Sequence, residues 1–260
     1  MKTLVAANQK GGVGKTAALV HVAFNFMERG LKVALIDLDT QANASYTLSQ
    51  FRTGALASEL FVDGPAPQWL SEPPPEAGLL LIESDPGLVN LERLALRDAN
   101  ARFRANMQKL GERQFDVCLI DTAPSMGIGM MAALYVADYV FSPIELEAYS
   151  IQGLKKLLTT ITHVRKSTSG LAPNAKLKFL GMLPSKVDAR KPRQVRNLRE
   201  LETTYPQLLI PYSIGFRDSI AEALASGVPV WQIKTTAARK AAEETRTVAN
   251  YLLEQMELSE

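Results

Sequence analysis

The sequence has few cysteines and histidines, and it has no long apolar run. Its one cysteine, Cys118, excludes an intrachain disulfide, a CxxC metal site and a cluster held by several thiolates of one chain. A reducing cytoplasm is the natural setting for such a chain. No apolar stretch approaches the roughly 20 residues that a membrane-spanning helix needs. The short apolar start, followed by a glycine-rich loop, does not resemble a signal peptide.

A strong net charge is also lacking, because 29 Lys and Arg residues nearly balance 27 Asp and Glu residues. The proportions of hydrophobic (47%) and charged (22%) residues are those of a soluble globular protein, which excludes disorder and low complexity. The balance hides an asymmetry. Residues 151–199 hold 12 basic residues against one acid, Asp188, a net +11, whereas the rest of the chain carries −9. A local excess of this size favours a polyanionic partner, and a solvated basic surface is the alternative.

Short continuous apolar runs alternate with stretches of helical spacing along the chain. This rhythm is typical of a doubly wound α/β fold, a mostly parallel sheet with helices on both faces. No linker divides the chain, so residues 1–260 are expected to form a single domain. The proline-rich stretch 64–78 is predicted to be an exposed loop. The predicted strands are 4–7, 33–36, 79–82, 117–120, 139–141, 179–183 and 208–210. The predicted helices are 15–28, 127–136, 150–166, 191–204 and 236–256.

A glycine-rich loop, Lys-Gly-Gly-Val-Gly-Lys-Thr at 10–16, follows a predicted strand and opens a predicted helix. Glycines let backbone N–H groups point at phosphate oxygens, and the helix N-terminus adds about half a positive charge. In a phosphate loop of this kind, Lys15 reaches the β- and γ-phosphates and Thr16 ligates Mg²⁺. The expected nucleotide-binding residues are Gly11, Gly12, Val13, Gly14, Lys15, Thr16 and Ala17.

Carboxylates follow two other predicted strands. Asp37 and Asp39 stand two residues apart at the end of one strand, so both can enter one site. Asp37 is interpreted as a holder of metal-bound water and Asp39 as the residue that orients the attacking water, and two ordinary turn residues are the alternative. The run 117–120 ends in Asp121, a Walker B pattern in which the carboxylate binds Mg²⁺ through water. The expected metal set is Thr16, Asp37 and Asp121.

Two features of these motifs carry a resemblance to a known family. Lys10 stands directly before the glycines, which makes 10–16 a deviant Walker A motif, and here the sequence resembles the ParA/MinD superfamily of SIMIBI-class ATPases. That family has Asp-x-Asp-Pro-Gln-x-Asn where residues 37–43 read Asp-Leu-Asp-Thr-Gln-Ala-Asn, so Thr40 replaces the proline and leaves the loop less rigid. Three later segments also match the family: 143–154, 220–223 and 227–230.

The resemblance implies a P-loop NTPase fold, ATP and Mg²⁺ as cofactors, and a homodimer in the ATP-bound state. Lys10 would reach across the dimer to the partner's nucleotide and neutralise charge on the transferred phosphoryl group, as an arginine finger does. Lys15 and Asp39 complete the expected catalytic set, since the family's equivalent of Asp39 supports hydrolysis. Base contacts are expected, by analogy, near Ser185 and Pro211. No motif distinguishes adenine from guanine.

Several branches of this superfamily do not fit the sequence. Nitrogenase iron protein and the iron–sulfur scaffolds need more cysteine than Cys118 alone. MinD-like ATPases need a basic amphipathic tail, whereas the residues at 253–260 are acidic, so no membrane partner is expected. The loop begins at Lys10, which predicts an architecture without the N-terminal DNA-reading domain of larger plasmid ParA proteins. A short ParA/Soj-like partition ATPase remains, cytoplasmic and nucleoid-associated.

The basic segment then predicts a DNA-binding surface. Arg193, Arg196 and Arg199 recur every three residues and share one helix face. Because no aromatic residues interleave with them, contacts to phosphates without sequence readout are favoured. The predicted DNA-binding residues are Lys186, Arg190, Lys191, Arg193, Arg196 and Arg199, with Arg217 as a further contact. The resemblance implies that the ATP-bound dimer holds nonspecific DNA and that a ParB-like partner stimulates slow hydrolysis.

Other interpretations stay open on the sequence alone. The basic stretch is also compatible with a solvated helix face. The chain is also compatible with a ParA-like ATPase that positions a protein cargo, or with a regulatory nucleotide switch that hydrolyses little ATP. The two histidines, His21 and His163, are interpreted as packing or surface residues, and Trp69 and Trp231 have no chemical partner visible in the sequence.

Overall fold

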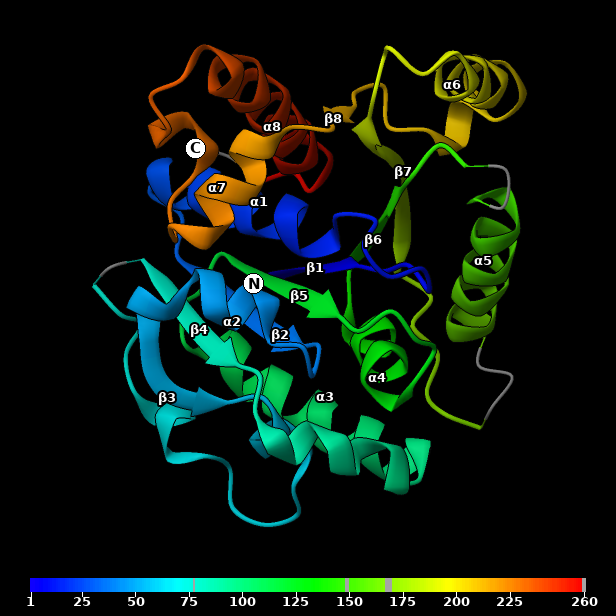
Figure 1. The fold of residues 1–260 in the computed structure, drawn as a ribbon. Helices are drawn as coiled ribbons and strands as arrows, with labels where there is room; N and C mark the ends of the chain where they lie inside the picture. The colour runs from blue at the N-terminus through cyan, green and yellow to red at the C-terminus, as the bar shows by residue number, and fades with distance from the viewer. Residues whose placement is uncertain (77, 148–149, 167–169, 259–260) are drawn as a thin grey trace.

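The computed structural model describes residues 1–76, 78–147, 150–166 and 170–258. Its strands are β1 (Lys2–Ala6), β2 (Val33–Leu38), β3 (Arg52–Leu56), β4 (Leu79–Glu83), β5 (Val117–Thr122), β6 (Tyr139–Ile144), β7 (Lys178–Val187) and β8 (Ile214–Gly215). Within the described residues they form one sheet in the order β3-β4-β2-β5-β1-β6-β7-β8, and every neighbouring pair is parallel (Figure 1). The predicted doubly wound α/β fold is confirmed.

The connections between strands are mostly helical. The α-helices are α1 (Lys15–Glu28), α2 (Asn43–Thr47), α3 (Leu96–Glu112), α4 (Ile128–Val136), α5 (Ser150–Lys166), α6 (Pro192–Thr204), α7 (Asp218–Ala225) and α8 (Thr236–Gln255). Short 3₁₀ turns lie at Ser49–Phe51, Ser58–Phe61, Gln68–Ser71, Pro86–Arg93, Pro206–Leu208 and Val230–Gln232. No helix in the described ranges combines the length and the apolar character that a membrane crossing requires.

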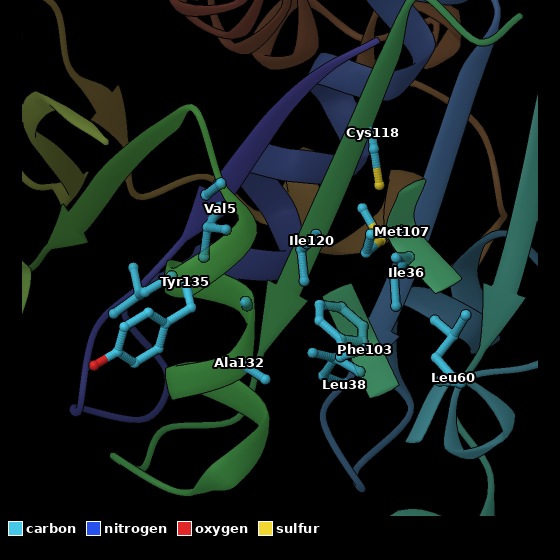
Figure 2. Close-up of a cluster of buried hydrophobic side chains, with 14 of the residues drawn as sticks. Val5, Ile36, Leu38, Leu60, Phe103, Met107, Cys118, Ile120, Ala132 and Tyr135 are labelled. Atoms are coloured by element: carbon cyan, nitrogen blue, oxygen red, sulfur yellow. The ribbon is translucent and has the colours of Figure 1, made fainter. Parts of the chain in front are cut away.

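The central strands are buried on both faces, which explains their continuous apolar character. In β1, Leu4 and Ala6 belong to the core shared with α1 and α8, whereas Val5 belongs to the core shared with α3 and α4. Figure 2 shows part of this second core, where Phe103 of α3 and Cys118 of β5 lie among other apolar side chains. Cys118 is fully buried, as expected, and burial raises the pKa of its thiol.

Most predicted elements are confirmed, and one predicted strand is wrong. The first six predicted strands correspond to β1, β2, β4, β5, β6 and β7, and the five predicted helices to α1, α4, α5, α6 and α8. The segment 208–210 is no strand, because Pro206 starts a 3₁₀ turn there and only Leu209 forms an isolated bridge, with Met182. The chain joins the sheet edge a few residues later, in the two-residue strand β8.

The proline-rich stretch is irregular, as predicted, but it is not wholly exposed. Its 3₁₀ turn buries Trp69 and Leu70 in the core that α3 covers. The Trp69 indole Nε1 donates a hydrogen bond to Glu59 at 2.6 Å, so this side chain has a polar partner as well. The expectation of an exposed loop is therefore wrong for these two residues. Residue 77 of this stretch lies outside the described residues.

Candidate nucleotide-binding site

A cleft of about 480 Å³ opens where the phosphate loop joins β1 to α1. The sheet order makes β1 a switch point, because β2 and β6 lie on opposite sides of it, the position where ligands bind in doubly wound folds. The loop turns through Gly12 and Gly14, whose φ angles of 75° and 93° lie in the left-handed region that glycine adopts without strain. Among the predicted nucleotide-binding residues, the loop residues at the cleft wall are Gly11, Gly12, Gly14, Lys15, Thr16 and Ala17.

The two lysines of the loop have different environments. Lys15 is buried, and its Nζ lies 3.2 Å from the carbonyl oxygen of Asn8. Burial lowers the pKa of Lys15, and the nearby carboxylates of Asp121 and Asp39 oppose this shift. The Lys10 side chain is half exposed, and its Nζ forms an ion pair with Glu145 at 2.5 Å. Lys15 therefore lies inside the cleft of its own chain, whereas Lys10 lies near the surface.

Asp37 and Asp121 face each other across adjacent strands, as the ends of β2 and β5 predict. They are register partners in the parallel ladder, where strands lie about 4.8 Å apart, and both are fully buried. Burial raises the pKa of Asp37, and burial and the neighbouring Asp37 raise the pKa of Asp121 to about 7. Two buried carboxylates this close favour a cation between or beside them.

The donor set at this point fits Mg²⁺. The Thr16 hydroxyl donates to Asp121 Oδ2 at 2.6 Å, while the buried Asp121 Oδ1 has no hydrogen-bond partner among the described residues. An orphaned carboxylate oxygen beside a Thr hydroxyl suits a hydrated cation, because Mg²⁺ keeps several of its waters and takes few protein ligands. No group of three or more His, Cys, Asp and Glu residues in the described ranges has the geometry to hold a metal ion by itself.

Asp39 lies at the cleft wall. It is buried, and its Oδ1 accepts a hydrogen bond from the Gln41 backbone N–H at 3.0 Å. Its own backbone N–H donates to Asp37 Oδ1 at 3.1 Å, which ties the two carboxylate residues together. The predicted pair therefore shares one site, with Asp37 inside and Asp39 at the surface of the cleft.

The cleft only partly matches the predicted base contacts. Ser185 lines it, and the Ser185 Cβ lies 3.7 Å, an ordinary van der Waals distance, from the position that a Cβ on Gly14 would occupy. Pro211 does not line it and instead lines a separate pocket of about 470 Å³ next to α6. The cleft wall instead includes both residues of β8 and the exposed Phe216, which follows β8 directly. Sequence reasoning missed these because a two-residue strand leaves no periodic signal.

The predicted DNA-binding residues do not form one uniform surface. Arg193, Arg196 and Arg199 are all exposed on α6, as their spacing predicts, and Arg193 pairs with Glu147 at 2.6 Å. Arg190 pairs with Asp188 at 2.9 Å, and Lys186 lies 3.9 Å from Glu145. Lys191 is exposed immediately before α6.

Arg217 differs from the other predicted DNA contacts. Its guanidinium binds Glu244 of α8 through two hydrogen bonds, at 2.6 and 3.0 Å, and only 23% of the side chain is exposed. This pair raises the pKa of Arg217, and the residue lines the nucleotide cleft. The structure therefore places Arg217 with the nucleotide site rather than with the exposed arginines of α6.

The fold, the phosphate loop and the carboxylate pair together define a P-loop nucleotide hydrolase of the doubly wound class. The sequence model of the AAA_31 family, an AAA domain, matches residues 1–178. The chain is 60% identical to Protein IncC of Escherichia coli, over all of this chain and 71% of that protein. It is 32% identical to the chromosome-partitioning ATPase Soj of Thermus thermophilus, over 73% of this chain and 71% of Soj.

Among solved structures, the cobyrinic acid a,c-diamide synthase of Mycobacterium smegmatis with bound ATP analogue and magnesium is similar, with a TM-score of 0.76. It is 25% identical, and the match covers 99% of this chain and 96% of that one. The chain belongs to the AAA_31 family and is a ParA/MinD-type partition ATPase. The segment 143–154, which matches this family in sequence, includes Ala148 and Tyr149, and these two residues lie outside the described residues.

Proposed function

We propose that the chain, as one ATPase domain over residues 1–260, binds ATP with Mg²⁺ in this cleft and partitions DNA as an ATP-bound homodimer. The observation that carries the proposal is the contrast between the two loop lysines. Lys15 is buried beside the carboxylates and serves its own nucleotide, whereas Lys10 is half exposed and accessible to a second molecule.

The described residues divide the chemistry of hydrolysis among them. Backbone N–H groups of the glycine loop and the Lys15 ammonium hold the phosphates, and the Thr16 hydroxyl and Asp121 hold the cation. When bound, Mg²⁺ neutralises charge that develops during phosphoryl transfer. Asp39, at the cleft wall, orients the attacking water, while Asp37 holds water of the cation's shell. The products are ADP and phosphate.

Lys10 couples nucleotide binding to dimer formation. In the single chain its ammonium is occupied by Glu145. In the dimer it exchanges this partner for the phosphates bound by the other subunit, where a cation stabilises the transition state as an arginine finger does. Hydrolysis then depends on the dimer, which keeps it slow in the single chain.

DNA binds to the exposed arginines of α6 through phosphate contacts without sequence readout. Within the described residues, Arg196 and Arg199 form no ion pair, so their charge is available to a polyanion. A ParB-like partner stimulates hydrolysis and releases the dimer from the DNA. Membership in the partition ATPase family supports this sequence of events and a cytoplasmic, nucleoid-associated protein.

The lysine contrast provides the test. In Lys15→Ala, binding of a fluorescent ATP analogue should be lost, because the buried ammonium is removed from the phosphates. In Lys10→Ala, binding should persist, but dimers with a non-hydrolysable analogue should disappear in light-scattering measurements. Single-turnover hydrolysis should then fall on the order of 10³-fold, the lower end of an arginine finger's contribution.

The matched control is Lys32→Ala, which removes an exposed lysine at the opposite end of the strands, immediately before β2. This variant should bind, dimerise and hydrolyse as the wild type does. A Lys10→Ala protein that dimerises and turns over normally would contradict the trans role of Lys10.

A further inference from the structure

A closed ring of hydrogen bonds joins Asp37 and Asp39, at the end of β2, to a serine that follows a different strand, β4. The Ser84 hydroxyl, just after β4, donates to the carbonyl oxygen of Asp39 at 2.7 Å. The Ser84 backbone N–H donates to the Ser45 hydroxyl at 2.8 Å, and that hydroxyl donates to Asp37 Oδ2 at 2.8 Å. The Asp39 backbone N–H closes the ring on Asp37 Oδ1.

The loop that follows Asp39 needs an external restraint. Its internal hydrogen bonds, from Gln41 N–H to the Asp39 carboxylate and from Ala42 N–H to the Asp39 carbonyl, move with the loop. Ala42 has a φ of 54°, a left-handed conformation that persists in a non-glycine residue only when the surroundings hold it. Thr40 adds no ring constraint to the backbone. The Ser84 hydroxyl is the contact that ties Asp39 itself to β4.

Ser84 is held rigidly enough to act as this restraint. β4 pairs with β2 in register up to Ile36 and Ile82, which fixes the position of the end of β4 relative to the end of β2. The next residue, Asp85, accepts three hydrogen bonds, from the Ser58 N–H, the Ser58 hydroxyl and the Gly87 N–H, at 2.7 to 2.9 Å. A strand on one side and a triply bonded carboxylate on the other leave the Ser84 backbone little freedom.

We propose that Ser84 is a positioning residue for hydrolysis: its hydroxyl holds the Asp39 carbonyl and thereby aims the Asp39 carboxylate at the attacking water. The proposal rests on the proposed function, since it takes Asp39 as the residue that orients this water. Ser84 contacts neither nucleotide nor cation in this role. It acts through Asp39, so its loss affects the chemical step and leaves nucleotide binding intact.

The test is Ser84→Ala in the full chain, assayed with ATP, Mg²⁺ and double-stranded DNA. The substitution removes the bond to Asp39 and keeps the backbone donor to Ser45. We expect kcat to fall about tenfold, since a misplacement of about 1 Å can cost as much as 10²-fold, with the KM for ATP unchanged. Hydrogen exchange at the amides of Gln41 and Ala42 should accelerate, and Ser84→Thr, which restores a hydroxyl, should recover most of the rate.

The matched control is Ser58→Ala. Ser58 is also a half-buried serine, and its hydroxyl also donates a hydrogen bond of 2.7 Å. The substitution removes this bond and keeps the backbone N–H donor. The lost bond, however, ends on Asp85 and not on Asp39. This variant should keep the wild-type kcat, because Asp85 retains its two backbone donors, the Ser58 and Gly87 N–H groups, which continue to hold the Ser84 backbone. Equal losses in Ser58→Ala and Ser84→Ala, or a loss of nucleotide affinity in Ser84→Ala, would mean a structural role and overturn the proposal.

Asp39→Ala separates the two levels of inference. If Asp39→Ala is inactive and Ser84→Ala turns over at the wild-type rate, Ser84 has no positioning role and the proposed function is unaffected. If Asp39→Ala keeps the wild-type rate, the catalytic assignment of Asp39 is wrong, and the role of Ser84 is refuted with it.

Discussion

The buried histidine of α1 predicts a specific acid sensitivity. His21 is 1% exposed, and its two ring nitrogens both have partners. Nδ1 lies 2.7 Å from the Ala17 carbonyl oxygen and must donate to it, while Nε2 accepts from the Val230 N–H at 3.2 Å. This arrangement requires the neutral ring. Burial lowers the pKa of His21 to about 4, and the bond to Ala17 opposes this shift only partly.

The sign and size of the effect follow from proton linkage. Between pH 6.5 and about 4, the unfolded chain binds a proton at this histidine and the folded chain does not. Stability contributed by the neutral ring is therefore present above pH 6.5 and is lost as the pH falls. At about 1.4 kcal/mol for each pKa unit, the loss is about 2 kcal/mol at pH 5 and about 3 kcal/mol at pH 4.

The measurement compares urea unfolding of the wild type and His21→Gln between pH 7.5 and pH 5. Glutamine does not titrate, so the difference in unfolding free energy between the two proteins should shrink by about 2 kcal/mol over this range. Taking the difference also cancels the buried Asp37 and Asp121, whose raised pKa values act with the opposite sign. A difference for His21→Gln that stays constant with pH would refute the reasoning.

Two further predictions concern the DNA surface and the core. Arg196→Ala with Arg199→Ala should weaken binding of all DNA sequences alike and reduce the slope of log affinity against log salt by about 2, roughly one unit for each lost phosphate contact. Lys155→Ala with Lys156→Ala removes the same charge from α5 and should have a clearly smaller effect if α6 is the interface. Phe103→Ala should lower the unfolding free energy by about 3 to 5 kcal/mol in urea titration, because the ring is fully buried and stacked on Phe61 at 4.7 Å. A loss under about 1 kcal/mol would mean that the core refills the space.

The fold could be predicted where burial is two-sided and could not where it is one-sided or absent. The inner strands show continuous apolar runs because both faces are covered. The edge strand β3 exposes Arg52, Thr53 and Gly54, so it carries no such run. Helix α3 was also missed, although Ala99, Phe103, Met107 and Leu110 recur at helical spacing and are buried. Its many charged and amide residues lower the average hydrophobicity and hide that stripe.

The site could be predicted as far as strand ends dictate it. Parallel strands end at one edge of a sheet, so Asp37 and Asp121 had to meet once both followed buried strands. The Ser84 hydroxyl belongs to the same edge, but a serine after a strand is too common to signal a role. The sequence pattern does not predict contacts made by irregular segments. The sequence predicts a strand at 208–210, but the chain forms a 3₁₀ turn at Pro206–Leu208 instead. Pro211 then lines a separate pocket and not the cleft.

The charge asymmetry of the sequence takes a more local meaning in the structure. A net +11 in residues 151–199 suggests a broad basic surface, yet several of these charges are already paired. Arg190 is paired with Asp188 and Arg193 with Glu147, both at hydrogen-bond distance. A phosphate must compete with those carboxylates, whereas at Arg196 and Arg199 no carboxylate of the described residues forms an ion pair that it would have to displace. Because counterion release rewards each cation that gains a phosphate, these two residues should account for more of the salt dependence than the paired arginines.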